Sequence, residues 1–295
     1  MTAARAGAAA PDIRAHYDAG DAFFALFLDS TLSYSCALFD DPAADLDAAQ
    51  RAKMDWHLDR AGVTRGTRLL DIGCGWGGLM ERAVWDRGAA HATGLTLSDA
   101  QAAHVAAAAP PRVTVHRQHW ADHAPSAPYD AIVSIGAFEH FAEPGLSRAA
   151  RVAAYADFFS RVASWMVPGG RLALQTIAYP AAFDRAAYDA SAYGAFVRSR
   201  IFPQSDLPTL DEILAAAGPT LEPEQIRNDR RHYAVTTRHW LSRLRSRHAE
   251  AAALVGERRV ADMARYFRIS IGAFEIGNLQ LLRLGLRKPA GRAAP

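Results

Sequence analysis

The sequence is short of cysteine, of long hydrophobic runs and of net charge. Its 295 residues include two cysteines, Cys36 and Cys74, too few for a disulfide framework, so a reducing cytoplasmic location is expected. No stretch approaches the roughly 18 uncharged apolar residues of a membrane span, and the alanine-rich start lacks a secretory h-region. At most peripheral membrane contact is therefore expected. The net charge of +2 argues against nucleic-acid binding, and no metal site is assigned.

What the sequence does contain is an alternation of short apolar runs with helical stretches. This pattern predicts an α/β fold, with a mostly parallel sheet and helices on both faces. The expected strands cover 68–72, 92–97, 112–117, 131–135, 171–177 and, in an alternating pattern, 279–287. The expected helices cover most of 12–60 and then 100–109, 146–166, 234–254 and 257–276.

A glycine-rich loop follows the first expected strand. Gly73, Gly75 and Gly78 match the pattern G-x-G-x-x-G, which lets a nucleotide approach the backbone at the start of the next helix. Asp71 stands two residues before the first glycine. A carboxylate at that place would repel a pyrophosphate and attract the ammonium of a methionyl group.

The end of the second strand discriminates further between nucleotides. A dinucleotide site requires an acidic residue there for the ribose, whereas this strand ends in the run Gly94–Ser98, with Gln101 one helical turn later. Hydroxyl and amide groups thus replace the carboxylate. Together with Asp71, this favours S-adenosylmethionine over NAD(P).

A second motif, the run Gly136–Phe141, follows the fourth strand and contains Glu139 and His140. The carboxyl ends of parallel strands face the crevice in which ligands bind. Glu139 is therefore expected beside the cofactor, in the substrate region, while a packed or capping imidazole is the favoured interpretation of His140.

These motifs together resemble the cyclopropane-fatty-acid synthase family of methyltransferases, most closely its short mycolic-acid cyclopropane synthase branch. The resemblance extends from about His16 to Lys288, and its most specific runs are Tyr34–Cys36 and Gly136–Phe141. Further matching runs are His16–Asp18, Asp21–Asp29, Leu70–Gly77, Ile201–Pro203, His232–Tyr233 and Gly272–Phe274.

The resemblance implies a Rossmann-like class I methyltransferase with a seven-stranded, mostly parallel sheet and a helical substrate cap. We expect one domain, residues 1–295, without the extra N-terminal domain of the phospholipid-acting synthases. Its expected parts are an N-terminal helical cap over the cofactor (1–60), a cofactor-binding core (61–178), a substrate-cap insertion (179–220), and C-terminal helices and strands (221–288).

The resemblance also implies the site residues. The residues implied to contact S-adenosylmethionine are Tyr34, Ser35, Gly73, Gly75, Thr96, Leu97, Gln101 and Trp120. In the family a bicarbonate ion acts as base, and the matching cradle comprises the Cys36 backbone, Glu139, Ile177 and Tyr233. Gln175 stands where the family usually has a histidine. Glutamine can hydrogen-bond to bicarbonate but cannot carry a positive charge or relay a proton near neutral pH, so the sequence leaves open whether bicarbonate binds.

The implied reaction is methylation of the carbon–carbon double bond of a lipid-like, acyl or natural-product substrate, giving a cyclopropane or methyl-branched product. Aromatic faces would stabilise the resulting cation, and the motifs place Tyr34 and Tyr233 at the site. Most of the other aromatic candidates, including Phe23, Phe138 and Phe202, are interpreted as core. A thiol nucleophile is disfavoured because neither cysteine has a base partner by motif.

Three other functions remain as alternatives. One is C- or N-methylation of a small specialised metabolite; another, less favoured, is an NAD(P)-dependent oxidoreductase; the third is a catalytically silent binder of a carrier protein. Seven arginines lie between Arg227 and Arg247, with Asp229 as the one acid. They predict either a solvated helix face or a landing patch for an anion such as an acidic carrier protein carrying the acyl chain.

Overall fold

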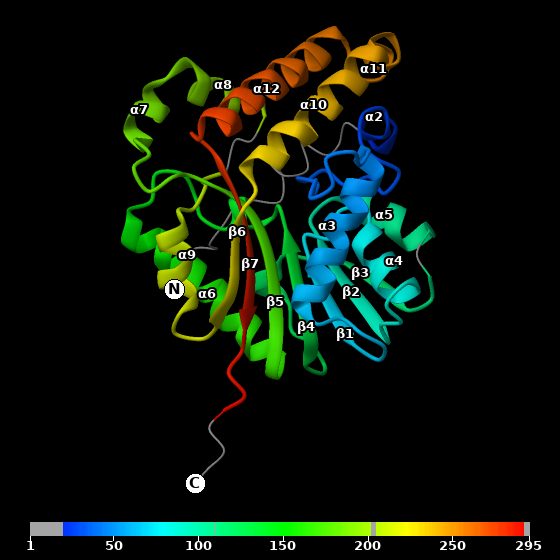
Figure 1. Cartoon of the computed structure of the whole chain (residues 1–295), viewed down its shortest axis with the longest axis vertical. Helices are drawn as coiled ribbons and strands as arrows, with labels where there is room; N and C mark the ends of the chain where they lie inside the picture. The colour runs from blue at the N-terminus through cyan, green and yellow to red at the C-terminus, as the bar shows by residue number, and fades with distance from the viewer. Residues whose placement is uncertain (1–19, 109, 202–204, 292–295) are drawn as a thin grey trace.

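A computed structural model describes residues 20–108, 110–201 and 205–291, and these residues form one seven-stranded sheet in the order β3-β2-β1-β4-β5-β7-β6 (Figure 1). The strands are β1 (Arg68–Ile72), β2 (His91–Thr96), β3 (Val113–Arg117), β4 (Tyr129–Ile135), β5 (Met166–Ala178), β6 (Glu222–Asn228) and β7 (Gln280–Arg287). The strands β1 to β5 pair in parallel, and β7 runs antiparallel to both of its neighbours. The expected mostly parallel sheet is confirmed.

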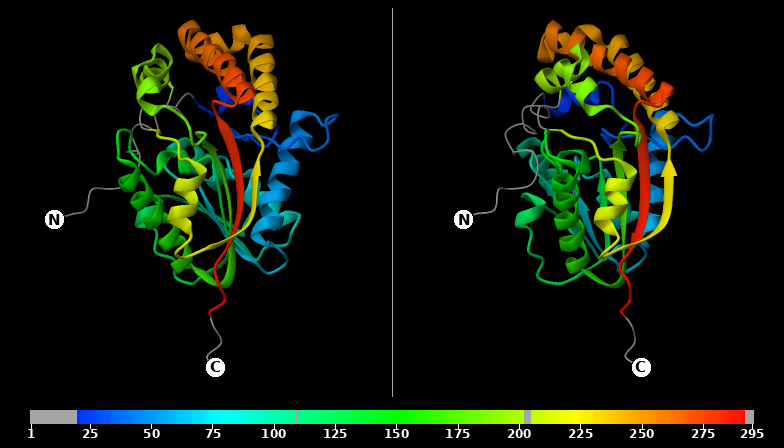
Figure 2. Two further views of the ribbon diagram at one scale, coloured as in Figure 1. Left: turned by 60° about the vertical axis from the view of Figure 1, so that its left-hand side comes forward. Right: turned by 90° about the vertical axis from the view of Figure 1, so that its left-hand side faces the viewer.

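Helices cover both faces of this sheet (Figures 1 and 2). One face carries α3 (Leu46–Ala61), α4 (Gly78–Trp85) and α5 (Asp99–Ala108), and the other carries α6 (Arg148–Trp165) and α9 (Leu210–Ala217). Side chains alternate between the two faces along each strand. Leu70 therefore packs with the cluster that contains Phe158, while Leu69 packs with the cluster that contains Leu58. Burial on both sides explains why the central strands are continuous apolar runs.

The remaining helices lie above the carboxyl ends of the strands, at the top of Figure 1. They are α2 (Asp21–Ala25), α7 (Arg185–Ala190), α8 (Ala192–Arg200), α10 (Arg230–Ser246), α11 (His248–Val255) and α12 (Glu257–Ile276). Two short 3-10 helices, η1 (Trp120–Asp122) and η2 (Phe138–His140), follow β3 and β4. None of the helices formed by the described residues combines the length and hydropathy needed to cross a bilayer.

The N-terminal region differs from the expected helices. Residues 1–19, with the His16–Asp18 motif, lie outside the described part of the chain, and α2 spans only Asp21–Ala25 before a long irregular segment. Phe23, Phe24 and Phe27 are fully buried in a cluster with Phe267 of α12. The aromatic run therefore reflects tertiary packing rather than a long helix. Within the expected cap 1–60, α3 packs along the sheet and also contributes Lys53 and Met54 to a cavity at the carboxyl ends of the strands, which residues 31–35 border as well.

Two further differences lie in the C-terminal part. The helix expected over 234–254 breaks at Arg247, where α10 ends and α11 begins. The strand β6 was not predicted, because its sequence Glu-Pro-Glu-Gln-Ile-Arg-Asn shows no apolar alternation. Pro223 is tolerated there because β6 lies at the edge of the sheet, where one side of the strand needs no ladder hydrogen bonds.

Candidate active site

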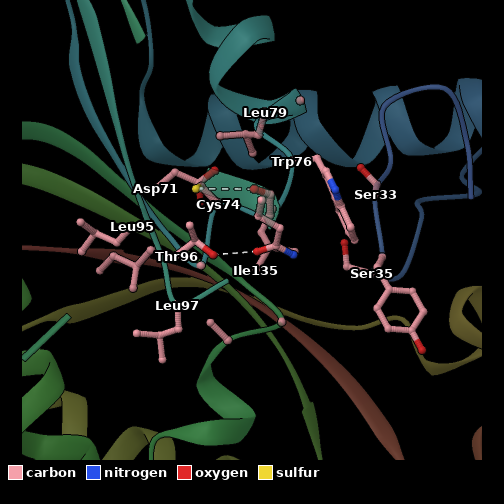
Figure 3. Close-up of a pocket in the computed structure, with 18 of the residues that line it drawn as sticks. Ser33, Ser35, Asp71, Cys74, Trp76, Leu79, Leu95, Thr96, Leu97 and Ile135 are labelled. Atoms are coloured by element: carbon pink, nitrogen blue, oxygen red, sulfur yellow. Dashed lines mark hydrogen bonds between the residues drawn. The ribbon is translucent and has the colours of Figure 1, made fainter. Parts of the chain in front are cut away.

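Two adjoining cavities lie at the carboxyl ends of the parallel strands. The first, of about 150 Å³, lies between the glycine loop, the ends of β1 and β2, and residues 31–35 (Figure 3). Every residue predicted to bind the cofactor lines this cavity: Tyr34, Ser35, Asp71, Gly73, Gly75, Thr96, Leu97, Gln101 and Trp120. The structure therefore brings together, from five separate segments, the groups that the motifs singled out.

The glycine loop needs its glycines for steric reasons. Gly73 and Gly75 have φ angles of 82° and 54°, in the left-handed region that other residues rarely adopt. A Cβ on Gly73 would lie 2.6 Å from the Cβ of Ala137, so the loop and the β4 end could not approach each other as closely. The backbone of the loop and the N-terminus of α4 therefore line this cavity.

The far end of the first cavity is polar and aromatic. The Thr96 hydroxyl donates to the Gln101 side-chain oxygen at 2.7 Å, so both side chains are held at the end of β2. Trp120 is 3% exposed and packs on Phe141 with ring centroids 5.2 Å apart. Among the described residues its indole N–H has no hydrogen-bond partner. Hydroxyl, amide and indole groups in this arrangement suit a ribose and an adenine.

Asp71 lies on the opposite side of the same cavity from Ser33 and Ser35 (Figure 3). Burial raises the pKa of its carboxyl group to about 7, and the charge of Lys53 opposes this rise. No described residue donates a hydrogen bond to this carboxylate. It therefore offers an unsatisfied acceptor for a ligand cation.

The second cavity, of about 460 Å³, is lined mainly by aromatic and apolar side chains. Tyr34, Ser35, Gly136 and His140 border both cavities, so a group in one can reach a molecule in the other across this shared wall. The aromatic residues of the second cavity are Tyr34, Tyr179, Phe183, Tyr188, Tyr193, Tyr233, Trp240, Tyr266, Phe267 and Phe274. Phe23 and Phe138 are core, as expected, and Phe202 lies outside the described residues, with most of the Ile201–Pro203 motif.

Glu139, in η2, lines the second cavity. Its Oε1 accepts a hydrogen bond from the backbone N–H of Ile177 at 2.7 Å, while its Oε2 is buried without a partner among the described residues. Burial raises the pKa of this carboxyl group to about 7. Near neutral pH, Glu139 can therefore either accept or donate a proton toward the cavity.

Gln175 borders the same cavity and is oriented by a neighbour that sequence reasoning missed. Its side-chain oxygen accepts from Nε of Arg283 at 2.8 Å. Because a guanidinium can only donate, this contact assigns the oxygen to the arginine and leaves the amide N–H groups for the cavity. Arg283 is fully buried, pairs with Asp229, and also donates to the backbone oxygens of Cys36 (3.1 Å) and Ala37 (3.0 Å).

Two predicted cradle residues, Cys36 and Ile177, have backbone groups that are engaged within the chain. Cys36 borders neither cavity, because its thiol is fully buried and its backbone oxygen is held by Arg283. Burial raises the pKa of this thiol to about 12, which removes it as a nucleophile. Ile177 borders the second cavity, but its N–H is already bonded to Glu139. The structure thus brings Glu139, Gln175, Ile177 and Tyr233 together around the second cavity. Cys36 is not among the residues that line it.

His140 occupies the shared wall with a neutral imidazole. Its Nδ1 lies 3.0 Å from the hydroxyl of Ser205, and burial lowers its pKa to about 4. Besides this contact with Ser205, the residue borders both cavities. Sequence analysis singled out neither Arg283 nor Lys53. Of these two residues, Lys53 borders the first cavity. The only sequence signal for either residue was a charged side chain at a position of its strand or helix that faces the core.

In the described ranges no cluster of three or more His, Cys, Asp or Glu side chains could hold a metal ion.

The fold and the first cavity define a class I S-adenosylmethionine-dependent methyltransferase. The structure of mycolic acid cyclopropane synthase CmaA1 complexed with SAH and CTAB matches with a TM-score of 0.86, covering 96% of this chain and 99% of that chain at 31% identity. The structure of the cyclopropane synthase MmaA2 from Mycobacterium tuberculosis matches with a TM-score of 0.85, covering 96% and 99% at 33% identity. S-adenosylmethionine as the cofactor is thereby confirmed.

The family follows from the sequence comparisons. Residues 5–284 match the family described as mycolic acid cyclopropane synthetase. The chain is also 37% identical over 272 residues to the hydroxymycolate synthase MmaA4 of Mycobacterium tuberculosis, which covers 87% of this chain and 85% of that protein. The chain belongs to the mycolic acid cyclopropane synthetase family.

Proposed function

We propose that this enzyme methylates a carbon–carbon double bond of a lipid-like, acyl or natural-product chain bound in the second cavity. The observation that supports this most is the position of Glu139. Glu139 lines an aromatic cavity that shares a wall with the cofactor cavity, and one of its buried carboxyl oxygens has no described hydrogen-bond partner. An alkene needs positioning and stabilisation of a cation more than it needs a strong base, and an aromatic cavity with one carboxyl group offers these.

In the proposed reaction the π electrons of the alkene attack the methyl carbon as the carbon–sulfur bond breaks, and S-adenosylhomocysteine leaves. The positive charge then lies on the other alkene carbon. Tyr34, Tyr233 and Phe274 line the cavity, and an aromatic face suitably placed beside such a cation stabilises it by roughly 0.5–2 kcal/mol. Loss of a proton from the new methyl group closes a cyclopropane, whereas loss from the neighbouring carbon gives a methyl-branched alkene.

The residues around Glu139 fit an oxyanion such as bicarbonate. Glu139 has an orphaned buried oxygen, and Gln175 has its amide N–H groups directed away from Arg283. A bound bicarbonate would supply the base for the final proton. With its pKa raised to about 7, Glu139 would share a proton with the anion and relay it onward, which an amide in its place could not do, while Gln175 would donate a hydrogen bond. The family's histidine could supply a positive charge at this position. Here the positive charge lies instead on Arg283, which contacts Gln175 on the side facing away from the proposed anion.

Presentation of the substrate on an acidic carrier protein is a finer part of the proposal. Of the arginines between Arg227 and Arg247, four are engaged within the chain: Arg227 with Asp40 and Asp229, Arg230 with the end of α12, Arg238 with Glu275, and Arg243 with Asp47 and Leu28. Within the described chain, the free part of the expected landing patch thus reduces to Arg231, Arg245 and Arg247.

A trideuteromethyl-labelled cofactor tests the proposal. The enzyme is incubated with S-adenosylmethionine carrying a CD3 group and with cis-monounsaturated acyl chains, free or on a carrier protein, and the products are analysed by mass spectrometry. A cyclopropane retains two deuterons, because the third is lost from the methyl group when the ring closes, whereas a methyl-branched alkene retains all three. Transfer only to amines or activated carbons of small metabolites would replace the proposal with the alternative acceptor class.

A further inference from the structure

The first cavity contains a buried ammonium group that has no carboxylate partner. Lys53 projects from the middle of α3 and is 2% exposed. Its Nζ lies 3.1 Å from the Ser35 hydroxyl and 3.4 Å from the Ser33 hydroxyl. Among the described residues no Asp or Glu oxygen lies within 4.0 Å of it. The carboxylates of Asp29 and Asp71 favour its charged form only from beyond ion-pair distance. Because a buried charge is costly unless it is directly paired, this ammonium is incompletely compensated.

The position of Lys53 is fixed by the surrounding structure. Three residues earlier on the same face of α3, Gln50 donates to the backbone oxygens of Ser33 (3.2 Å) and Ser35 (2.9 Å). One turn later, the imidazole of His57 bonds to the Lys53 backbone oxygen at 2.7 Å. The buried polar face of α3 thus holds the segment 33–35 against the cavity, with the ammonium directed to the two serine hydroxyls.

Lys53 and Asp71 form the charged ends of one cavity. Both border it, and Asp71 has no described hydrogen-bond donor. Asp71 lies at one side, and the serines that contact Lys53 lie at the other (Figure 3). Burial lowers the pKa of Lys53 to about 8 and raises that of Asp71 to about 7, so burial disfavours the charged form of each group, and their mutual attraction offsets this only in part. The methionyl end of S-adenosylmethionine is a zwitterion, with a carboxylate and an ammonium on the same carbon.

We propose that Lys53, with the Ser35 hydroxyl, binds the α-carboxylate of the methionyl group of S-adenosylmethionine, while Asp71 receives the α-ammonium. Lys53 is thereby a further cofactor-binding residue, and it selects the complete amino-acid end of the cofactor over analogues that lack the carboxylate. This inference rests on the methyl donor and not on the identity of the methyl acceptor. Its failure would therefore leave the proposed alkene reaction untouched.

Three ligands separate the two charges in a calorimetric binding test. S-adenosylhomocysteine has both groups, its decarboxylated analogue S-adenosyl-3-thiopropylamine has only the amine, and methylthioadenosine has neither. We expect Lys53→Met to weaken the binding of S-adenosylhomocysteine about 10- to 100-fold, because one or two charge-assisted hydrogen bonds to the ligand are lost. The affinity for the decarboxylated analogue should change less than about 3-fold in the same variant.

Two further variants keep the outcome interpretable. Lys53→Gln preserves a hydrogen bond to the serines without the charge, and it should show the same ligand-selective loss. Asp71→Asn should weaken both amine-containing ligands and leave methylthioadenosine unchanged. The unfolding midpoint without ligand should not fall in Lys53→Met, which confirms that the variant is folded. Equal losses for S-adenosylhomocysteine and its decarboxylated analogue, or unchanged binding of both, would overturn the assignment of Lys53.

Discussion

Replacement of Arg283 by methionine tests the buried network behind the second cavity. The substitution leaves Asp229 without its fully buried partner, and removing one member of such a pair costs about 3–5 kcal/mol. Asp229 keeps a second contact, to Arg227 at 3.1 Å, so the lower value of about 3 kcal/mol applies. Hydrogen bonds to Gln175, Cys36 and Ala37 are lost at about 1 kcal/mol each, partly offset by the apolar methionine. We expect a total loss of about 4 kcal/mol.

The assay is equilibrium unfolding in urea, followed by the fluorescence of the six tryptophans. Arg287 provides a matched control on the same strand. Its side chain is 38% exposed and lies 3.4 Å from Glu222, so Arg287→Met should cost less than about 1 kcal/mol. The double variant Arg283→Met with Asp229→Asn should be at least about 2 kcal/mol more stable than the sum of the single effects predicts, because it removes both buried charges.

The same variant also tests the orientation of Gln175. Without Arg283, the Gln175 oxygen loses its described donor and the amide can rotate, so methyl transfer should fall more than the affinity for S-adenosylhomocysteine. If Arg283→Met destabilised the protein no more than Arg287→Met, or if the double variant were additive, the buried network would not have the role assigned to it.

Three further predictions concern the site itself. Glu139→Gln should abolish methyl transfer while leaving cofactor affinity within a few-fold, measured by label transfer and calorimetry; a normal rate would remove Glu139 from the proposed mechanism. Gly73→Ala should abolish cofactor binding because its Cβ would meet Ala137 at 2.6 Å, whereas Gly66→Ala, with similar φ and open space, should bind the cofactor as the unmodified enzyme does. Binding of S-adenosylhomocysteine at pH 6.5 should release protons, because the ligand ammonium lowers the raised pKa of Asp71; calorimetry in two buffers measures this, and an Asp71→Asn variant that released as many would refute it.

The parts of the fold that can be predicted from the sequence are those with a local signal. The strands from β1 to β5 are apolar runs bounded by turns, and the glycine loop follows the first of them directly, so the motifs alone are enough to assemble the cofactor cavity. The range 257–276, expected to be helical, is the range that α12 spans. By contrast, β6 is an exposed edge strand whose only signal is its neighbour β7.

The groups that sequence analysis missed depend on contacts across long separations. Arg283 meets Gln175 because β7 pairs with β5 in a register that places these two residues opposite each other, 108 positions apart. That register is set by strand order and by the alternation of Leu281 to Leu286, not by either residue. Lys53 similarly depends on the segment 33–35, which is irregular and has no periodic signal.

The position of β7 has a consequence for how the protein is made. β7 is the last strand in the described chain, yet it lies between β5 and β6 and is the only described strand paired with β6. Synthesis on a ribosome therefore delivers β6 and Asp229 well before the strand that joins them to the sheet. Since a domain generally folds as a unit, the sheet closes only once β7 is available, in the same step that buries Arg283. Nascent chains ending before residue 283 lack both a strand between β5 and β6 and the arginine that fixes Gln175, so methyl transfer should appear only after β7 has been made.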